Sequence, residues 1–277
     1  MLVDQAAIQA ELSAYRGAGG GTVIDCQPPG CGRDGRKLLA LSEASGTKIV
    51  ACTGFHLQKY YPPEAWMFRA SQERAGQFFV REIQEGLWET RDDSRLVQAG
   101  FIKIACENTL KSSPRRLIEA AAQASLATNT AILIHTERGE AAEEIIQFMI
   151  GLGLPPTRLV LCHMDKRPDL ELHKQLAGEG VLLEYDTFYR PKYRPEENAW
   201  PLLEQMVADG LAAGIAIGTD MADAGLWSRL DGGPGLTGLI TQIIPRLRAI
   251  GCDAQTIHQL TGGNISRLLA RAHIRTD

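Results

Sequence analysis

Residues 131–135 read Ala-Ile-Leu-Ile-His, a short apolar run that ends in a histidine. The same arrangement returns in Val160-Leu-Cys-His163 and, with a different polar end, in Ile217-Gly-Thr-Asp220. Each run has the length of a buried strand and is followed by a longer stretch with the apolar spacing of an amphipathic helix. Strands that alternate with helices predict a parallel β-sheet.

Seven segments of the chain have the composition of strands, and amphipathic helices are expected between them. The strand segments are Thr22–Asp25, Lys48–Thr53, Phe101–Ala105, Ala131–His135, Arg158–His163, Gly180–Asp186 and Gly214–Asp220. Helical spacing is clear in Gly139–Leu152, Asp169–Gly178, Glu197–Ala213 and Leu236–Ile250. No linker, low-complexity stretch or block of charge divides the chain, so we expect one domain over residues 1–277.

Polar residues at the strand ends distinguish two kinds of parallel sheet. Lys103, His135, His163 and Asp220 follow one another at intervals of 32, 28 and 57 residues. In a doubly wound sheet ligands gather at one switch point, whereas in a (β/α)8 barrel every strand delivers its carboxyl end to one mouth. We therefore predict an α/β fold, a (β/α)8 TIM-type barrel. Because seven strands are found and the chain opens with the helix-like stretch Asp4–Arg16, we expect the barrel to lack its first strand.

Composition excludes several classes of protein. With 277 residues, 44% of them hydrophobic and 22% charged, the chain is not disordered, collagen-like or a disulfide scaffold. Its net charge of −4 gives no global attraction to nucleic acid or to an anionic membrane, and its apolar runs are too short to span a bilayer. Six scattered cysteines without a CxxC pair, and no evident signal peptide, favour reduced thiols and a cytoplasmic protein.

The four strand-end residues have the chemistry of a metal site. A histidine at the end of an apolar strand presents its imidazole to a divalent metal, and Asp220 is suited to bind metal, to act as a base, or both. Lys103 lies inside an apolar strand, where an unpaired ammonium is costly, and carbamylation by CO2 would convert it to an anionic oxygen ligand. The alternatives are structural histidines with hydrogen-bond partners, a Lys103 side chain that reaches solvent, and an Asp220 that caps a helix.

Stretches beyond the strand ends carry a family pattern. They are Gly-Gly-Gly-Thr-Val-Ile-Asp25, Gly32-Arg33-Asp34, Val50-Ala-Cys-Thr-Gly-Phe55, Arg81-Glu-Ile-Gln-Glu-Gly86, Ala99-Gly-Phe-Ile-Lys103, His135-Thr-Glu, Cys162-His163 and Gly218-Thr-Asp220. Together they resemble the phosphotriesterase-related branch of the amidohydrolase superfamily over essentially the whole chain. The resemblance implies a (β/α)8 barrel with a binuclear metal centre, commonly of zinc.

The resemblance also implies roles for single residues. Lys103 would be the carbamylated bridge between two metal ions, His135 and His163 would be ligands of one ion, and Asp220 would be a ligand of the other and the catalytic proton acceptor. A metal-activated hydroxide would attack a lactone, a carboxylic ester or a phosphotriester, because a bound metal lowers the pKa of water and polarises the scissile bond.

One feature of the family is absent from this sequence. The family carries a His-x-His on its first strand, as two ligands of the more buried metal, and none of the six histidines here forms that motif. We therefore expect ligands for one metal ion but not for two, which leaves three alternatives. Either the reading frame begins upstream of Met1, or the protein is a catalytically silent member that binds an anionic ligand or a partner, or it is a mononuclear hydrolase that uses His135, His163 and Asp220.

A cationic loop bears on the substrate. The segment Arg190-Pro-Lys192-Tyr193-Arg194 places three cations within five residues, and it would lie at the barrel mouth. Arginine forks and a lysine point charge suit a phosphate or a carboxylate, and such barrels often bind phosphate near their last two loops. The alternative is a solvated surface loop whose cations pair with the glutamates that follow.

The same loop makes the family resemblance more specific. With His135-Thr-Glu-Arg-Gly, Cys162-His163-Met-Asp-Lys-Arg-Pro-Asp169 and Asp231-Gly-Gly-Pro-Gly235, it is similar to the family members that hydrolyse sugar lactones, including phosphorylated furanonolactones. Arg229 is a further candidate partner for an anion. We expect a lactonase for a small anionic or phosphorylated sugar lactone, with a phosphotriesterase or carboxylesterase as the alternative. The expected partner is the small-molecule substrate, and a homodimer is left open.

Overall fold

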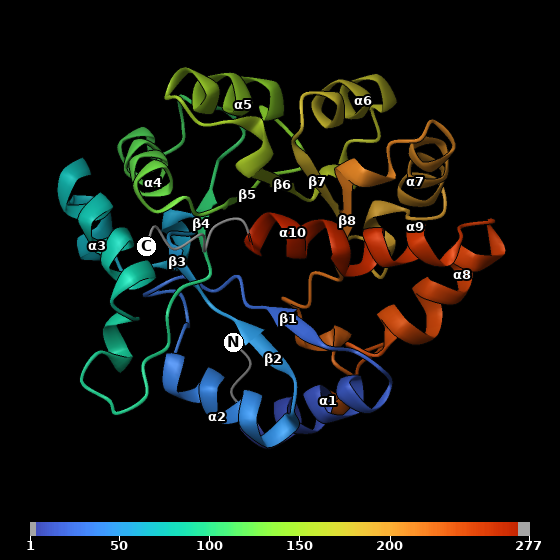
Figure 1. Ribbon diagram of the computed structural model, residues 1–277, viewed down its shortest axis with the longest axis horizontal. Coiled ribbons are helices and arrows are strands. Elements are labelled where there is room, and N and C mark those ends of the chain that lie inside the picture. Colours follow the sequence, from blue (N-terminus) through green and yellow to red (C-terminus); the bar gives the residue numbers. More distant parts are fainter. Residues whose placement is uncertain (1–3, 271–277) are drawn as a thin grey trace.

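The structure, a computed structural model, describes residues 4–270 as alternating strands and helices (Figure 1). The strands are β1 (Thr22–Ile24), β2 (Lys48–Val50), β3 (Cys52–Gly54), β4 (Phe101–Ala105), β5 (Ile132–His135), β6 (Leu159–Cys162), β7 (Leu182–Tyr185) and β8 (Ile215–Ile217). The helices are α1 (Gln5–Gly17), α2 (Gly35–Ser45), α3 (Gln72–Gln84), α4 (Arg115–Thr128), α5 (Ala142–Gly151), α6 (Leu170–Gly178), α7 (Ala199–Ala208), α8 (Ile244–Ala249), α9 (Ala254–His258) and α10 (Asn264–Ala270).

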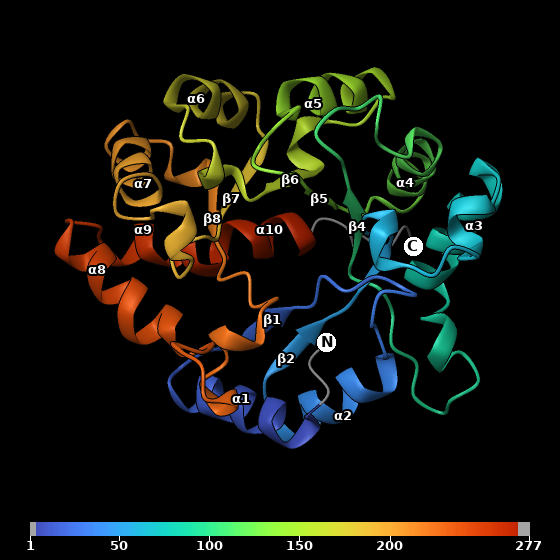
Figure 2. The ribbon, with the colours of Figure 1, turned by 180° about the vertical axis from the view of Figure 1, so that it is seen from behind.

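The strands β3 to β8 form one parallel sheet in which each strand pairs with the next one along the chain. β1 pairs with β2 in the same parallel sense, and Ala51 alone separates β2 from β3. Helices surround the strands in both views of the ribbon (Figure 1, Figure 2). This is the arrangement of a TIM-type barrel, as the sequence predicts.

Side chains on the strands alternate between the inside and the outside of the barrel. On β4, Ile102 and Ile104 pack outward against the helices, whereas Phe101 belongs to an inner cluster. The buried members of that inner cluster are Cys52, Phe101, Ala131, Leu133, Val160, Cys162, Leu182, Ala216 and Leu268. An alternation of period two, with branched and aromatic residues on both faces, is what a strand with two buried faces requires.

The helix α10 covers the end of the barrel at which the strands begin. Its Leu268 packs in the inner cluster with Phe101, the first residue of β4, and with Leu182, the first residue of β7. α10 crosses in front of the strands in Figure 1 and lies behind them in Figure 2. The opposite end, at which the strands finish, is therefore the end available for a functional site.

The predicted strands and the predicted first helix are confirmed. All seven strand segments are present, although Ala51 divides the second into β2 and β3. The expected helix at Asp4–Arg16 is α1, and the Asp4 carboxylate accepts a hydrogen bond from the backbone N–H of Ala7 at its start. Within residues 4–270, α1 precedes the first strand, so no strand comes before β1 there.

Two predicted helices have different boundaries in the structure. The helix expected over Glu197–Ala213 ends at Ala208, and Gly210 follows with a φ of +78°, a conformation that ends helices. The helix expected over Leu236–Ile250 starts as a π-helix at Leu239 and becomes α-helical only in α8. In the described part of the chain, no helix combines the length and the apolar character needed to cross a membrane.

A buried arginine joins three separate segments of the fold. The Arg33 side chain is fully buried, and its guanidinium donates to the carboxylate of Glu82 on α3, to the carboxylate of Glu89 and to the carbonyl of Cys52 on β3. Glu82 also accepts from the Thr53 hydroxyl at 2.7 Å. Because a buried charge is tolerated only when it is paired and hydrogen-bonded, this network fixes the loop after β1 against β3 and α3.

We expect Arg33→Met to lower the free energy of unfolding by about 3 kcal/mol, because it leaves two buried or half-buried carboxylates without their cation. The matched control is Arg36→Met, since Arg36 forms an exposed ion pair with Asp93, and an exposed pair of this kind contributes little to stability. Urea unfolding followed by circular dichroism measures both. Equal effects of the two substitutions would contradict the role assigned to Arg33.

His173 on α6 is a buried histidine with a lowered pKa. Its Nδ1 lies 2.6 Å from the Tyr185 hydroxyl, and its Nε2 lies 2.9 Å from the carbonyl oxygen of Arg167. Burial lowers the pKa of His173 to about 4, from an ordinary value of 6.5. The folded-state pKa is the lower one, so protonation favours the unfolded chain. The stability present above the unfolded pKa is lost as the pH falls from 6.5 towards 4.

His173→Gln is expected to flatten the acid side of the stability profile. Between pH 7 and pH 5 the variant should lose about 2 kcal/mol less unfolding free energy than the original protein, because one titrating group is removed. Urea unfolding at the two pH values provides the comparison, with the exposed His258 replaced by Gln as the control. The assignment fails if the two variants lose equal amounts.

Candidate metal centre

The candidate residues come at the ends of neighbouring strands. His135 is the last residue of β5, His163 directly follows β6, Asp186 directly follows β7, and Asp220 comes shortly after β8. Because parallel strands direct their carboxyl ends to the same edge, these side chains meet at one mouth of the barrel. Lys103, in the middle of β4, lies deeper in the same barrel.

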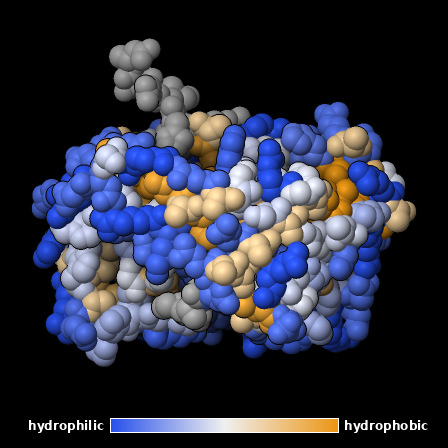
Figure 3. Space-filling view, turned by 90° about the horizontal axis from the view of Figure 1, so that it is seen from below, coloured by the Kyte–Doolittle hydropathy of each residue, from blue (hydrophilic) through white to orange (hydrophobic). Residues whose placement is uncertain are grey.

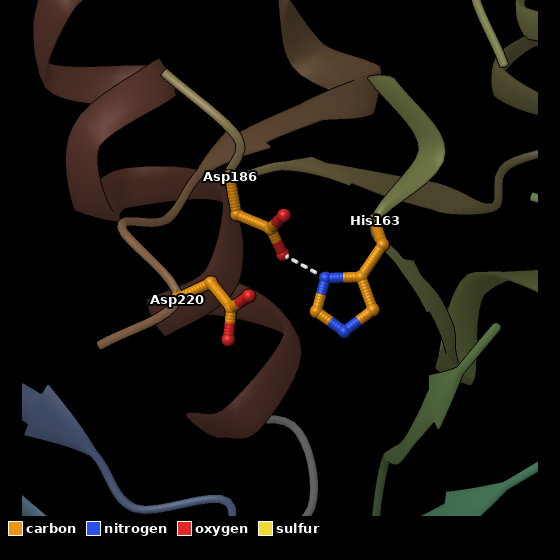
Figure 4. Close-up of side chains that lie close together, drawn as sticks. All are labelled: His163, Asp186 and Asp220. Carbon is orange, nitrogen blue, oxygen red and sulfur yellow. Dashed lines mark ion pairs between the residues drawn. The ribbon is translucent and has the colours of Figure 1, made fainter. Parts of the chain in front are cut away.

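The ring of His163 lies between two partners. Its Nε2 is 2.9 Å from Nδ1 of His135, and its Nδ1 is 2.7 Å from Oδ2 of Asp186 (Figure 4). A carboxylate beside one imidazole nitrogen favours the tautomer that carries its proton there, which leaves the lone pair of the other nitrogen available to a metal. His163 Nε2 and His135 Nδ1 therefore converge as two nitrogen ligands.

Asp220 lies beside His163 and Asp186. Ligand atoms of His163, Asp186 and Asp220 are within 4.8 Å of one another, and they are the one such group of three found among residues 4–270. Figure 4 shows both carboxylates turned towards the space next to the His163 ring. Arg190 contacts Asp220 twice, through Nη2 to Oδ2 at 2.9 Å and to the backbone carbonyl oxygen. The arginine expected to hold substrate thus pairs with a candidate metal ligand in this structure.

Two of the candidate residues have unusual backbone conformations. His163 has a φ of +65° and Asp220 a φ of +40°, in the left-handed region that residues with a side chain avoid. Such conformations cost on the order of 1–3 kcal/mol and concentrate at functional sites, where the surrounding structure maintains them. The strain at both positions supports a functional role.

The two imidazoles are neutral in this environment. Burial lowers the pKa of His163 to about 4, and the nearby Lys166 ammonium adds to the effect. Burial, followed by the charge of Lys103, holds the pKa of His135 well below its ordinary value. Neutral imidazoles keep their lone pairs at pH 7, as metal ligation requires.

A buried carboxylate holds the end of β7 and with it Asp186. Oδ2 of Asp165 accepts from the backbone N–H of Asp186 at 3.1 Å, from the backbone N–H of Thr187 at 2.8 Å and from the Thr187 hydroxyl at 2.6 Å. Burial raises the pKa of Asp165 to about 7, with the Asp186 charge adding to the effect. Burial also raises the pKa of Asp186 above its ordinary value, with the Asp220 charge adding to the effect.

Lys103 points into the barrel, so the alternative of a side chain that reaches solvent is wrong. The residue is 3% exposed, and its Nζ lies 3.6 Å from Sγ of Cys162. The end of β3 packs directly against it: Gly54 has a φ of +105°, and a Cβ there would lie 1.9 Å from the Lys103 carbonyl oxygen. Only glycine fits at that position, so the backbone of Lys103 is held firmly.

Three residues close to the site were not among those selected from the sequence. Asp186 has the same signal as the others, a polar residue at a strand end. His56 follows β3 closely, and its ring lies 4.8 Å from that of His135. Its Nδ1 accepts from the backbone N–H of Leu57 at 2.7 Å, so the proton of the neutral ring is on Nε2. Lys166 follows β6 in the same way.

The cationic loop is divided between the interior and the surface. Lys192 is exposed, and its Nζ lies 4.9 Å from the centre of the Tyr193 ring; Nζ of Lys166 lies at the same distance from that ring. Arg194 pairs with Glu197, as the solvated-loop alternative expected. Arg229, in the loop after β8, is exposed. The surface-loop alternative therefore describes Arg194 but not Arg190, whose side chain is largely buried against Asp220.

These side chains fit one divalent metal ion. Two neutral imidazoles with nitrogens 2.9 Å apart suit two ligands placed about 2.1 Å from one ion, and a carboxylate beside them completes the kind of donor set that zinc prefers. Asp186, next to the far nitrogen of His163, matches the carboxylate that commonly orients a ligating histidine. Lys103 would add an oxygen ligand only as its carbamate.

Comparison with known proteins gives a consistent result. The model of the phosphotriesterase family matches residues 3–269. A phospho-furanose lactonase of Mycoplasmopsis synoviae (strain 53) is 30% identical over 94% of this chain and 78% of its own length. A phospho-furanose lactonase of Mycoplasmopsis agalactiae is also 30% identical, over 98% of this chain and 81% of its own.

The fold agrees with these relatives. The crystal structure of a lactonase from Listeria monocytogenes matches this one with a TM-score of 0.89, over 97% of this chain and 87% of that chain, at 24% sequence identity. The same barrel is therefore present in both proteins. With a family match that spans nearly the whole sequence, the chain belongs to the phosphotriesterase family.

Proposed function

We propose that this protein is a metal-dependent lactonase that acts on a small anionic or phosphorylated sugar lactone. The observation that carries the proposal is the convergence of His135 Nδ1 and His163 Nε2 at 2.9 Å, at the barrel mouth and beside Asp220. Family membership indicates a hydrolase. The choice of a phosphorylated lactone is supported by the names of two relatives at 30% identity and by the cations that surround the mouth.

In this proposal His135, His163 and Asp220 hold the metal ion, expected to be zinc, and Asp186 orients His163. A divalent metal, when bound, lowers the pKa of water and polarises the lactone carbonyl. Asp220 would accept a proton from the attacking water, since its carboxylate lies close to the His163 ring. Lys103, as a carbamate formed with CO2, supplies a further oxygen ligand and removes the buried cation from the interior.

The anionic end of the substrate binds to the loops after β6, β7 and β8. Lys166 and Lys192 extend from two of these loops to the same Tyr193 ring, and two ammonium groups that share one ring repel each other. A phosphate that contacts both removes this repulsion and gains charge-assisted hydrogen bonds. Arg229, on the third loop, adds a planar donor fork.

The metal ligands and the residue that orients them give different results when replaced. His163→Ala should retain no zinc after dialysis, whereas Asp186→Asn should bind zinc about 10 to 100 times more weakly, because the ring of His163 is no longer oriented. Plasma mass spectrometry measures zinc in protein purified with bicarbonate and without chelator, and competition with a chromogenic chelator gives the affinity.

The exposed His258 serves as the control, since His258→Ala should bind zinc as the original protein does. Unchanged zinc content in His163→Ala would refute the ligand assignment. Zinc-loaded original protein that hydrolyses neither phosphorylated nor unphosphorylated lactones, nor simple esters, would instead identify a silent member of the family.

Lys192→Ala tests the site for the anion. Its KM for a phosphorylated five-membered sugar lactone should rise about tenfold with little change in kcat, because one charge-assisted hydrogen bond is lost. Its KM for the unphosphorylated lactone should stay constant. Arg190→Ala should lower kcat as well, since Arg190 contacts Asp220. Steady-state kinetics on both lactones provide the test, and equal changes of KM for the two substrates would contradict it.

A further inference from the structure

The carboxylate of Glu11 lies buried between α1 and the loop that follows β8. Its Oε2 accepts from the Ser228 hydroxyl at 2.7 Å and from the backbone N–H of Arg229 at 3.0 Å. Its Oε1 accepts from the backbone N–H of Leu236 at 2.9 Å. Glu11 itself is fully buried. Three donors from one distant loop therefore converge on a single side chain of the first helix.

The loop is shaped around this carboxylate. Gly235 has a φ of +73°, and a Cβ at that position would lie 2.2 Å from Oε1 of Glu11 and 2.9 Å from the Ser228 hydroxyl oxygen. A side chain at position 235 would thus displace the carboxylate from its donors. Gly235, the last residue of the Asp231-Gly-Gly-Pro-Gly235 stretch, permits this close approach.

Apolar side chains also join α1 to the loop after β8. Trp227 and Leu236 from the loop pack with Leu12 and Tyr15 of α1 in one cluster. The indole N–H of Trp227 donates to the carbonyl of Met221 at 2.7 Å, which closes the first part of the loop on itself. Figure 3 shows the side of the molecule on which α1 and α2 lie, where the outer surface mixes hydrophilic and hydrophobic residues.

The hydrogen bonds that stabilise the buried Glu11 carboxylate come from the loop after β8. Across the part of the chain that the structure describes, no lysine, arginine or histidine forms an ion pair with Glu11. A buried carboxylate is costly unless hydrogen bonds satisfy it, and here the donors all come from residues 228–236. The loop conformation and the burial of Glu11 therefore stabilise each other.

We infer that Glu11 is a positioning residue for substrate binding: it fixes the backbone of the 221–236 loop and so determines where Arg229 presents its guanidinium. The backbone N–H of Arg229 is itself one of the three donors, so the root of that side chain is fixed directly. The loop also follows Asp220 immediately in the chain. The inference rests on the proposed function in that Arg229 contacts the anionic end of the substrate.

Glu11→Gln tests this role with the least change in shape. The amide keeps one acceptor oxygen and places N–H groups against backbone or hydroxyl donors, so the loop loses part of its anchor. We expect the KM for a phosphorylated sugar lactone to rise about tenfold, with kcat changed less than about twofold. The KM for the unphosphorylated lactone and the zinc content should not change.

Two further variants calibrate the result. Ser228→Ala removes one donor and should raise the same KM about threefold, since the two backbone donors remain. Glu171→Gln replaces an exposed glutamate on α6 and should leave every parameter unchanged. Amide hydrogen exchange should be faster over residues 226–236 in Glu11→Gln and unchanged in β4 to β7.

The outcomes separate this inference from the proposed function. Unchanged amide hydrogen exchange of the loop in Glu11→Gln refutes the inference. A KM that rises equally for both lactones, or a fall in kcat alone, also refutes it. Either of these kinetic results would indicate a merely structural role for Glu11. If the original protein hydrolyses no lactone, the proposed function fails. Calorimetric binding of inorganic phosphate then decides: weaker binding in Glu11→Gln supports the inference, whereas equal binding or none in the original protein overturns it.

Discussion

Parallel pairing of neighbouring strands is the constraint on which the site depends. Each strand from β3 to β8 pairs with the next in the same direction, so residues far apart in sequence finish at one mouth. The register is specific: His135 pairs with Cys162 across β5 and β6, which brings His163, one residue later, within 2.9 Å of the His135 ring. A shift of one residue would turn inward-facing side chains outward and separate the two nitrogens.

The fold, and the positions of His135, His163 and Asp220 at strand ends, were predictable because their signals are local. Apolar runs ending in His135, His163 or Asp220 reveal strand and strand end in a single stretch of sequence. Which nitrogen of His163 faces Asp186 is decided by the approach of separate strands, and no sequence pattern encodes it. Glu11 looks like one more polar residue of an amphipathic helix, because its donors lie more than 200 residues away. Helix ends were less predictable still, since Gly210 in a left-handed conformation ends α7 early.

Positive charge at the mouth is of two kinds. Lys192 and Arg229 are exposed, so solvent and salt screen them, and a substrate can contact them without a change elsewhere. Arg190 is largely buried and already paired with Asp220. Arg190 therefore connects the loop after β7 to the residue proposed to accept the proton, whereas Lys192 and Arg229 are not paired with it.

The position of α10 has a consequence for the synthesis of the protein. Its Leu268 completes the inner cluster at the start of the strands, yet α10 follows all eight strands in the chain. At a translation rate of about 5–20 residues per second, β8 precedes α10 out of the ribosome by roughly 2 to 10 seconds. During that interval the apolar interior of the nascent barrel lacks the residues of α10 that cover one end of it. The arrival of α10 covers that end of the apolar interior.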